Sequence, residues 1–178
     1  ERENTTTGRK VTNVYDENNV EARCHGNRLS QTRSWTGTQY QGITSQTTLT
    51  EWWVYETDPG EGEFNRVLTY TDPLNRQTTY GYNSEGSLTL ITYPTVTEGL
   101  LAGSSQASSE GFAYNIYGQM TAHSWHDASR VDTFEYSSVT SYLETHIVNA
   151  GTNPQALPAD AQVTTYETDT RGNVTKIT

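Results

Sequence analysis

Few residues of this sequence have side chains that could carry out a reaction, and the first of them is a thiol beside an imidazole. Cys24 and His25 are adjacent, and together they have the chemistry of a nucleophile and its base. On a strand, however, adjacent residues point to opposite faces. A nucleophile needs its base within hydrogen-bond reach. We therefore predict no catalytic role for this pair.

A second group combines two histidines with an acid. His123, His126 and Asp127 lie close together around Trp125. Two histidines three residues apart, with an acid, could bind a metal ion if they lay on a helix. This segment has the composition of a strand or turn, so we interpret these residues as solvated turn residues. The sequence predicts no metal site and no cofactor.

The other acids are numerous but dispersed. At turn positions their expected role is to accept hydrogen bonds from backbone amides. A glycosidase would need two carboxylates at a set separation in a cleft, which spacing along a chain does not establish. We predict no catalytic residue, and a carbohydrate-active enzyme remains an alternative. The acids considered are Asp16, Asp58, Asp72, Asp127 and Asp169.

Four tryptophans could form a platform on which sugar rings stack. Trp52 and Trp53 are adjacent in a strand-like segment, so at most one of them belongs to any single surface. Packing in the core or between hairpins is the preferred interpretation for Trp35, Trp52, Trp53 and Trp125. A carbohydrate-binding surface or adhesin that uses exposed Trp and Tyr is kept as the alternative. The sequence has no phosphate-binding glycine loop, nucleotide fingerprint or serine nucleophile elbow.

The composition excludes several partners. Eleven Lys and Arg stand against 21 Asp and Glu, a formal net charge of −10, which repels nucleic acids and anionic membranes. No segment approaches the apolar length of a membrane span. Only 32% of residues are hydrophobic, yet there are 12 Tyr, 4 Trp and 3 Phe. Tyrosine supplies apolar area in place of aliphatic residues, which favours an ordered, β-rich protein with a thin core.

One stretch contains a nearly complete β-hairpin pattern. Asp72-Pro73 can open a tight turn, because proline presets φ and the aspartate can accept amide hydrogen bonds. Thr78, Tyr80 and Tyr82 then alternate in a run rich in β-forming residues. Residues 83–86 predict a second turn in which the glycine takes positive φ. Residues 88–92 alternate again as the next strand.

The same stretch resembles the YD repeat of Rhs proteins, teneurins and insecticidal-toxin shell components. Asn75 stands where that repeat usually has glycine, and asparagine is the non-glycine residue that best tolerates such turn positions. Partial copies of the pattern recur, so that repeat-like units are predicted near 8–23, 65–94, 112–122 and 164–178. In the first copy Asn19 occupies the glycine position. The signature residues are Tyr15, Asp16, Asp72, Pro73, Arg76, Tyr80, Tyr82, Asn83, Gly86, Tyr114, Asn115, Gly118, Tyr166 and Gly172.

Between the copies, residues near 95–111 and 149–161 are expected to form irregular insertions, because Gly, Ser, Ala and Pro replace β-forming residues there. Residues 36–49 are a polar stretch, interpreted as a loop or a solvent-exposed strand. Further strands are expected over 51–55, 130–136 and 141–148. The whole chain, 1–178, is treated as one repeat domain.

The fold class expected from these patterns is all-β. One hairpin cannot bury a face alone, so antiparallel hairpins stack side by side, with tyrosines in ladders across them. The resemblance implies a curved continuous sheet, an arc of a β-shell or filament wall, around a cargo polypeptide. The last unit stops where the pattern would continue at the first, so each end is either a cut in a longer protein or a site of head-to-tail assembly.

The function expected is that of a non-enzymatic, structural wall segment, extracellular or at the cell surface. Its expected partners are other YD-repeat segments or copies of itself, with an enclosed polypeptide or surface glycans. Two glycosylation sequons begin at Asn4 and Asn173, and either is an acceptor if the chain is secreted.

Overall fold

The computed structural model describes residues 2–4, 9–35, 47–58, 60, 64–95, 108–126, 130–151 and 157–178. The chain divides into two compact units. The first comprises Glu1–Ser87 and Tyr93–Val96, and the second comprises Leu88–Thr92 and Thr97–Thr178. No helix in the described parts of the chain has the length and apolar character needed to span a bilayer.

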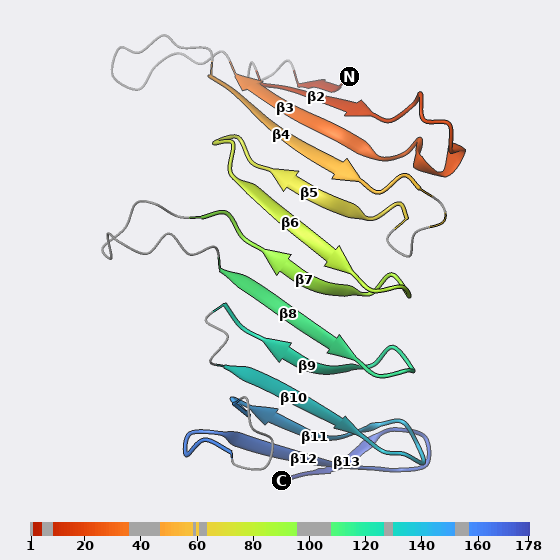
Figure 1. Ribbon diagram of the computed structural model, residues 1–178, viewed down its shortest axis with the longest axis vertical. Helices are drawn as coiled ribbons and strands as arrows, with labels where there is room; N and C mark the ends of the chain where they lie inside the picture. The colour runs from red at the N-terminus through yellow and green to blue at the C-terminus, as the bar shows by residue number, and fades with distance from the viewer. Residues whose placement is uncertain are drawn as a thin grey trace. The chain divides into compact units, whose positions relative to one another are not determined.

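The first unit is an antiparallel sheet whose strands lie in the order of the sequence (Figure 1). Consecutive strands pair with each other from β1 to β6. A short 3₁₀ helix, η1 (Ala22–Cys24), lies between the second and third strands. The strands are β1 (Arg2–Asn4), β2 (Arg9–Tyr15), β3 (Arg28–Trp35), β4 (Thr47–Tyr55), β5 (Val67–Thr71) and β6 (Gln77–Tyr82).

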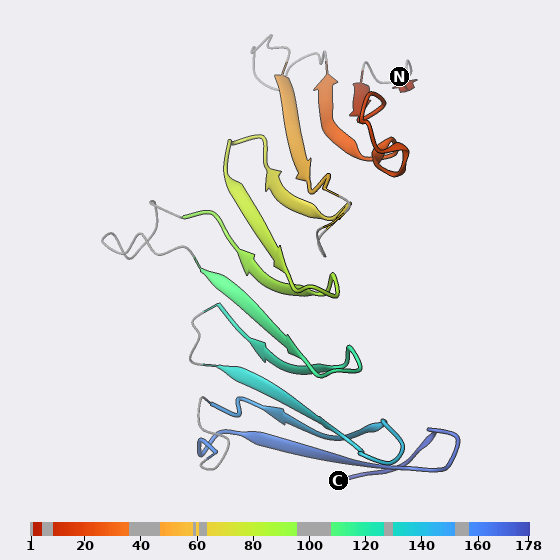
Figure 2. The same ribbon diagram turned by 45° about the vertical axis from the view of Figure 1, so that its right-hand side comes forward.

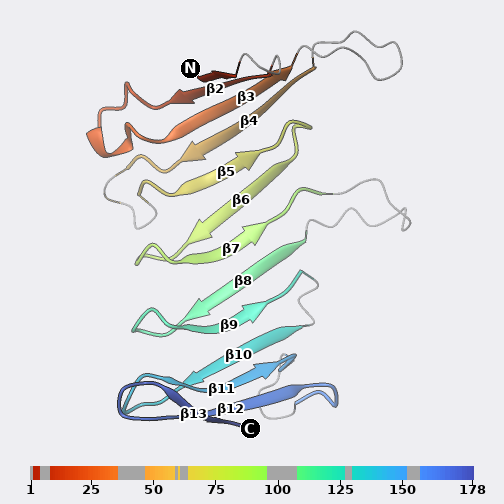
Figure 3. The same cartoon turned by 180° about the vertical axis from the view of Figure 1, so that it is seen from behind.

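The second unit repeats this arrangement. Seen from behind, its strands again follow one another in sequence order (Figure 3), and each described pair is antiparallel. The strands are β7 (Leu88–Thr92), β8 (Ser109–Tyr114), β9 (Met120–Ser124), β10 (Val131–Tyr136), β11 (Leu143–Val148), β12 (Gln162–Thr168) and β13 (Val174–Ile177). The all-β, antiparallel repeat class expected from the sequence is confirmed.

The core is thin. Among the described residues, the buried apolar side chains are Cys24 and Ala150, and the one buried charged side chain is Asp132. Most strand residues are half-buried in a single layer, so rings and side-chain hydrogen bonds contribute much of the packing. The composition predicted this thin core, in which tyrosine supplies apolar area in place of aliphatic residues.

Several predicted strands are confirmed. Residues 51–55 lie in β4, and β10 pairs with β11, as the alternation of 130–136 and 141–148 indicated. Residues 77–82 and 88–92 form β6 and β7, with a turn at 83–87.

The first repeat copy differs from its prediction. Asn19 was expected to occupy a left-handed turn position, but the described residues with positive φ do not include it. Its amide instead donates to Asp16 Oδ2 at 2.7 Å, and its Oδ1 accepts from Glu21 N at 2.9 Å. These bonds open a longer loop, residues 16–27, that contains η1 and buries Cys24. A side chain that caps the backbone locally competes with the tight turn.

The insertion expected near 95–111 ends earlier than predicted, because β8 begins at Ser109. Gly111 belongs to this strand, although glycine is a poor strand former. A Cβ atom there would lie 2.5 Å from Ser124 Oγ on β9, so glycine permits this close approach of two strands. The expected features at residues 36–46, 96–107 and 152–156 lie outside the described residues, as do Gly8 and Asp127.

Candidate functional site

Repeated turns are the first functional feature, because they set the spacing of the hairpins. Four five-residue turns share one pattern: the first N–H donates to the fifth carbonyl, and the fourth N–H donates to the first carbonyl. The first side chain, an Asp or Asn, accepts a hydrogen bond from the fifth N–H at 2.8–3.0 Å. The turns are 72–76, 83–87, 115–119 and 169–173.

The fourth residue of each turn adopts positive φ. The φ values are +62° at Asn75, +77° at Gly86, +76° at Gly118 and +87° at Gly172. Glycine reaches this region without strain, and asparagine is the best substitute. The glycine positions of the sequence pattern therefore correspond to a backbone requirement in these four turns.

Arg76 and Asp72 show what the two signature side chains do. Arg76 Nε donates to Asp72 Oδ2 at 2.7 Å, while Asp72 Oδ1 accepts the N–H groups of Leu74 and Arg76 at 2.9 Å. Partial burial raises the pKa of Asp72, but the hydrogen bonds from Arg76 and Leu74 outweigh it and hold that pKa below its usual range. The pair stabilises the turn, and both oxygens of the Asp72 carboxylate accept hydrogen bonds within it.

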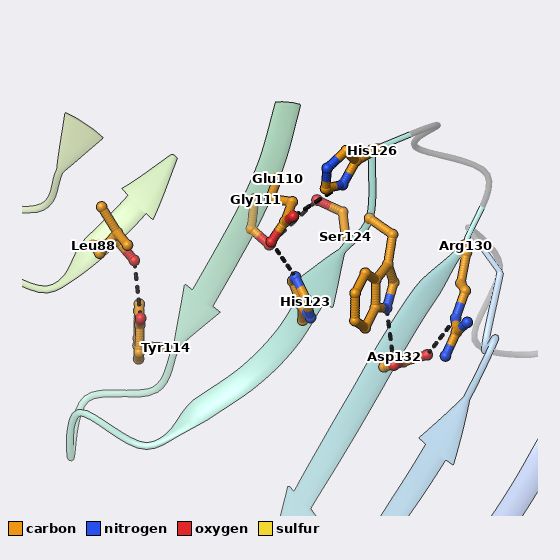
Figure 4. Close-up of polar contacts among 10 residues, drawn as sticks. Leu88, Glu110, Gly111, Tyr114, His123, Ser124, His126, Arg130 and Asp132 are labelled. Atoms are coloured by element: carbon orange, nitrogen blue, oxygen red, sulfur yellow. Dashed lines mark hydrogen bonds and ion pairs between the residues drawn. The ribbon is translucent and has the colours of Figure 1, made fainter. Parts of the chain in front are cut away.

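Tyrosines at strand ends form a second repeated feature, a link from phenol to backbone. Each donates its hydroxyl hydrogen to the carbonyl of the first residue of the preceding strand. The pairs are Tyr55 with Arg28 (3.4 Å), Tyr82 with Val67 (2.9 Å), Tyr114 with Leu88 (2.9 Å) and Tyr136 with Met120 (2.9 Å). Figure 4 shows the link from Tyr114 to Leu88.

The sequence identified Tyr82 and Tyr114 but missed Tyr55 and Tyr136. Both missed residues end a strand and precede a polar residue that caps the next turn. Glu56 Oε1 accepts from Thr57 N and Asp58 N, and Ser137 Oγ accepts from Val139 N and Thr140 N. A search for Tyr followed by any capping residue would have found them.

The remaining signature residues lie at other positions. Tyr80 lies two residues before Tyr82 in β6, and Tyr15 is the last residue of β2. In the last copy Thr168, not Tyr166, precedes the turn-opening Asp169, so Tyr166 corresponds to Tyr80. The sequence predicted ladders of tyrosine rings across the hairpins. At the four linked positions the tyrosine hydroxyl instead donates to a backbone carbonyl of the preceding strand.

A cluster of ionisable residues lies across β8 and β9 (Figure 4). Glu110 holds two histidines at once: Oε2 lies 3.1 Å from His123 Nε2, and Oε1 lies 2.9 Å from His126 Nδ1. His123 stacks on Phe112 with centroids 4.7 Å apart, and its ring lies 4.3 Å from that of Trp125. The sequence paired these histidines with Asp127 and missed Glu110, because its proximity depends on strand register.

The cluster has the donor types of a metal site but not the arrangement. Both carboxylate oxygens of Glu110 already contact imidazole nitrogens. Within the described residues, no group of three or more His, Cys, Asp or Glu could hold a metal ion. The cluster cross-links β8 to β9 and the residues that follow β9.

Asp132 on β10 is the centre of an adjoining network. Its Oδ2 accepts from Trp125 Nε1 at 2.9 Å, and its Oδ1 accepts from Asn149 N at 2.8 Å and lies 3.5 Å from Arg130 Nε. Burial raises the pKa of Asp132, but the bonds from Asn149, Trp125 and Arg130 outweigh it, so the pKa is lowered. The carboxylate therefore joins the ends of three consecutive strands.

Cys24 and His25 do not form a catalytic pair. Cys24 is fully buried in η1, while the exposed His25 places Nε2 2.8 Å from the carbonyl oxygen of Asn19.

Trp52 and Trp53 do lie on opposite faces of β4, as predicted, and only Trp53 packs against Tyr70 and Arg28. Asn173 lies in its turn, with Nδ2 donating to Asp169 Oδ2 at 2.9 Å. Nothing is described for the side chain of Asn4.

Part of the segment that carries these turns and links matches a protein-family model. The RHS Repeat model matches residues 63–95, the segment that includes β5, β6 and β7. The chain carries an Rhs repeat. The predicted resemblance to the YD/Rhs family is thereby confirmed. The turns at 72–76 and 83–87 and the link from Tyr82 to Val67 lie within the matched residues.

Solved structures show the same fold. A crystal structure of TcdB2-TccC3-Cdc42 matches with a TM-score of 0.58 and 20% identity, and one of TcdB2-TccC3-TEV matches with a TM-score of 0.57 and 21% identity. Each match covers 85% of this chain and 7% of the other, so the chain spans a small part of those proteins. Comparison with curated proteins gives no match.

We expect the tyrosine links to stabilise the sheet measurably. Tyr136→Phe removes the bond to Met120 O and should lower the free energy of unfolding by about 1 kcal/mol. Burial raises the pKa of Tyr136, so the stability gained from its neutral form is complete below pH ~10 and is lost as pH rises through the higher folded value. Urea unfolding at pH 7 and at alkaline pH measures both effects.

Tyr117→Phe is the matched control for this prediction. Tyr117 lies in the turn after β8, and its side chain is largely exposed. We therefore expect Tyr117→Phe to change the free energy of unfolding by less than about 0.5 kcal/mol. Equal losses in the two variants would show that the link at Tyr136 contributes no stability.

Proposed function

We propose that this chain is a non-enzymatic wall segment of a secreted or cell-surface protein, in which Rhs repeats join other repeats, or other copies of the chain, to enclose a polypeptide. The Rhs repeat and the matching fold support a structural repeat segment. The observation that carries the proposal is the recurrence of one turn and one tyrosine link along both units.

This construction suits a wall. Within each unit, the described strands pair with their neighbours in sequence, so a sheet of this kind grows by adding hairpins without a closed core. Both faces of such a layer remain available, one to solvent and one to whatever the wall surrounds. The extracellular location is supported by the family resemblance alone.

The described chemistry supports a role without catalysis. Asp72 and Asp169 accept backbone hydrogen bonds in turns, Asp132 is buried in a network, and Glu110 is shared by two histidines. These carboxylates are used to hold strands and turns. We therefore propose that this chain has a structural role rather than a catalytic one.

Mass and shape in solution test this proposal. We expect light scattering to give a mass that rises with concentration above 19.9 kDa, and negative-stain microscopy to show ordered particles of constant width. Circular dichroism at each concentration confirms that the associating chain is folded. A folded monomer at every concentration would contradict assembly with copies of the chain.

A further inference from the structure

One kind of cross-strand pair recurs in both units, and in two hairpins it contains a histidine. In four of the described hairpins an aromatic residue lies directly opposite one residue of the following strand. That opposite residue is a tyrosine or an isoleucine in two hairpins, so packing at this position does not require an imidazole. The pairs are Trp53 with Tyr70, Phe112 with His123, Phe134 with His146 and Tyr166 with Ile177.

The two histidines pack on their phenylalanines in the same way. His123 stacks on Phe112 with ring centroids 4.7 Å apart and 8° between the ring planes. His146 stacks on Phe134 with centroids 4.6 Å apart and the same angle of 8°. The stacking is therefore equal in the two hairpins, and any difference in their response to a proton comes from the polar groups around each ring.

His123 has a negative charge at hydrogen-bond distance. Its Nε2 lies 3.1 Å from Oε2 of Glu110 on β8, and the other oxygen of Glu110 contacts His126 (Figure 4). Asp132 lies directly opposite His123 on β10, and Arg130 lies 3.5 Å from that carboxylate. A proton added to the His123 ring is thus stabilised by a charge-assisted hydrogen bond to Glu110.

His146 has no such partner. Its Nε2 is buried and makes no hydrogen bond to the residues that the structure describes. On β12 the residue directly opposite is Thr164, which carries no charge. A proton added to the His146 ring would therefore place a positive charge beside a buried nitrogen that has no acceptor, which costs free energy.

The ionisable groups on the strands around His146 do not supply that acceptor. Asp132, two residues before Phe134 on β10, accepts hydrogen bonds from other residues. Glu144 is exposed at the bulge of β11. The phenols of Tyr136 on β10 and Tyr166 on β12 carry no charge at neutral pH.

We propose that His146 makes the pairing of β10 with β11 acid-sensitive, so that this hairpin opens on mild acidification while the hairpin of β8 and β9 stays closed. Histidine ordinarily takes up a proton between about pH 5 and pH 8. An opened hairpin exposes the His146 ring to water, where the proton is accepted without this cost. The stability of the β10–β11 pairing therefore falls as pH falls through that range.

This inference goes beyond the wall function, because it names a condition under which one hairpin of the second unit opens. It rests on contacts within that unit alone. It is independent of what a wall would enclose and of whether copies of the chain associate.

Hydrogen exchange of backbone amides in the full chain, followed by mass spectrometry, tests the proposal. Protection is compared at pH ~7.5 and pH ~5 after correction for the intrinsic pH dependence of exchange. We expect the protection of β10 and β11 to fall at least about tenfold and that of β8 and β9 to change less than about threefold. Asp132 keeps its charge at pH ~5, because its pKa lies below the usual range.

Three variants assign the effect to the imidazole. His146→Phe keeps a ring against Phe134 but takes up no proton, so the loss of protection in β10 and β11 should disappear. His146→Ile introduces the residue type that Ile177 places at the equivalent position, and it gives the same test if His146→Phe fails to fold. Glu110→Gln removes the negative charge beside His123, so β8 and β9 should also lose at least about tenfold in protection at pH ~5.

His25→Gln is the matched control. His25 is exposed and lies in the first unit, so its substitution should leave exchange in β8–β11 unchanged at both pH values. All chains are compared at one concentration, which keeps any association constant.

Three results would overturn the proposal. The first is unchanged protection of β10 and β11 at pH ~5 in the wild-type chain. The second is an equal loss in every strand of the second unit, which would be unfolding of the unit as a whole. The third is a loss that persists in a folded His146→Phe or His146→Ile chain, which would assign the acid response to another group.

Discussion

Asp132→Ala is expected to lower the free energy of unfolding by about 3 kcal/mol, because hydrogen bonds to a charged group contribute about 1.5–3 kcal/mol and their loss leaves buried donors unsatisfied. Asp132 is only 5% exposed. Its removal would leave the indole N–H of Trp125 and the backbone N–H of Asn149 without their acceptor. Urea unfolding followed by fluorescence measures the loss.

Asp132→Asn separates shape from charge. The amide keeps one oxygen acceptor but loses the negative charge that Arg130 faces, so we expect a smaller loss, about 1–2 kcal/mol. Glu135→Ala, an exposed site on the same strand, should change stability by less than about 0.5 kcal/mol. If Asp132→Ala is no more destabilising than Glu135→Ala, the network does not hold these strands.

The pH dependence of Asp132 has a definite sign. Its pKa in the folded chain is lowered, so its contribution to stability is present above the unfolded value of about 3.9 and is lost as pH falls through the folded value. The wild-type chain should therefore lose stability steeply below pH ~4. Asp132→Asn should show a shallower acid limb in thermal unfolding at pH 2–7.

Gly172→Ala is expected to be the most damaging turn substitution, with a loss of about 2–4 kcal/mol. A left-handed conformation costs a non-glycine residue about 1–2 kcal/mol, and Gly172 has φ +87°. A Cβ atom there would also lie 2.7 Å from Tyr142 Cζ, so that ring must move. Thermal and urea unfolding measure the change.

Gly118→Ala is the matched control for the backbone contribution. Gly118 has φ +76°, and a Cβ atom there would meet nothing within 4 Å, so the loss should be about 1–2 kcal/mol. Adding Tyr142→Ala to Gly172→Ala should recover the difference in a double-mutant cycle. Equal losses at Gly118 and Gly172 would show that the Tyr142 ring moves aside freely.

Local features were predictable because local chemistry determines them. A five-residue turn needs a side-chain acceptor at its first position and positive φ at its fourth, and both requirements are met within five residues at Asn115 and Gly118. The five-residue turns after β6 and β8 can be followed in Figure 2. Strand alternation is equally local, so Trp52 and Trp53 could be assigned to opposite faces in advance.

The first loop shows where local reasoning failed. Asn19 has the residue type of a left-handed turn position, but its amide bonds to Asp16 and Glu21 instead. The same loop buries Cys24 completely, and that burial involves residues along the whole of it. The spacing of residues along the sequence does not indicate whether the Cys24 side chain is buried.

Contacts across strands are what a reading of the sequence could not supply. Glu110 is 13 residues from His123, and Asp132 is 17 residues from Asn149, so each pair forms only when strands align in one register. The sequence accounts for the class of fold, the repeat and its turns, because hydrogen bonds within a few residues specify them. Which carboxylates meet histidines or are buried depended on strand pairing, because pairing energies are shared across the whole sheet.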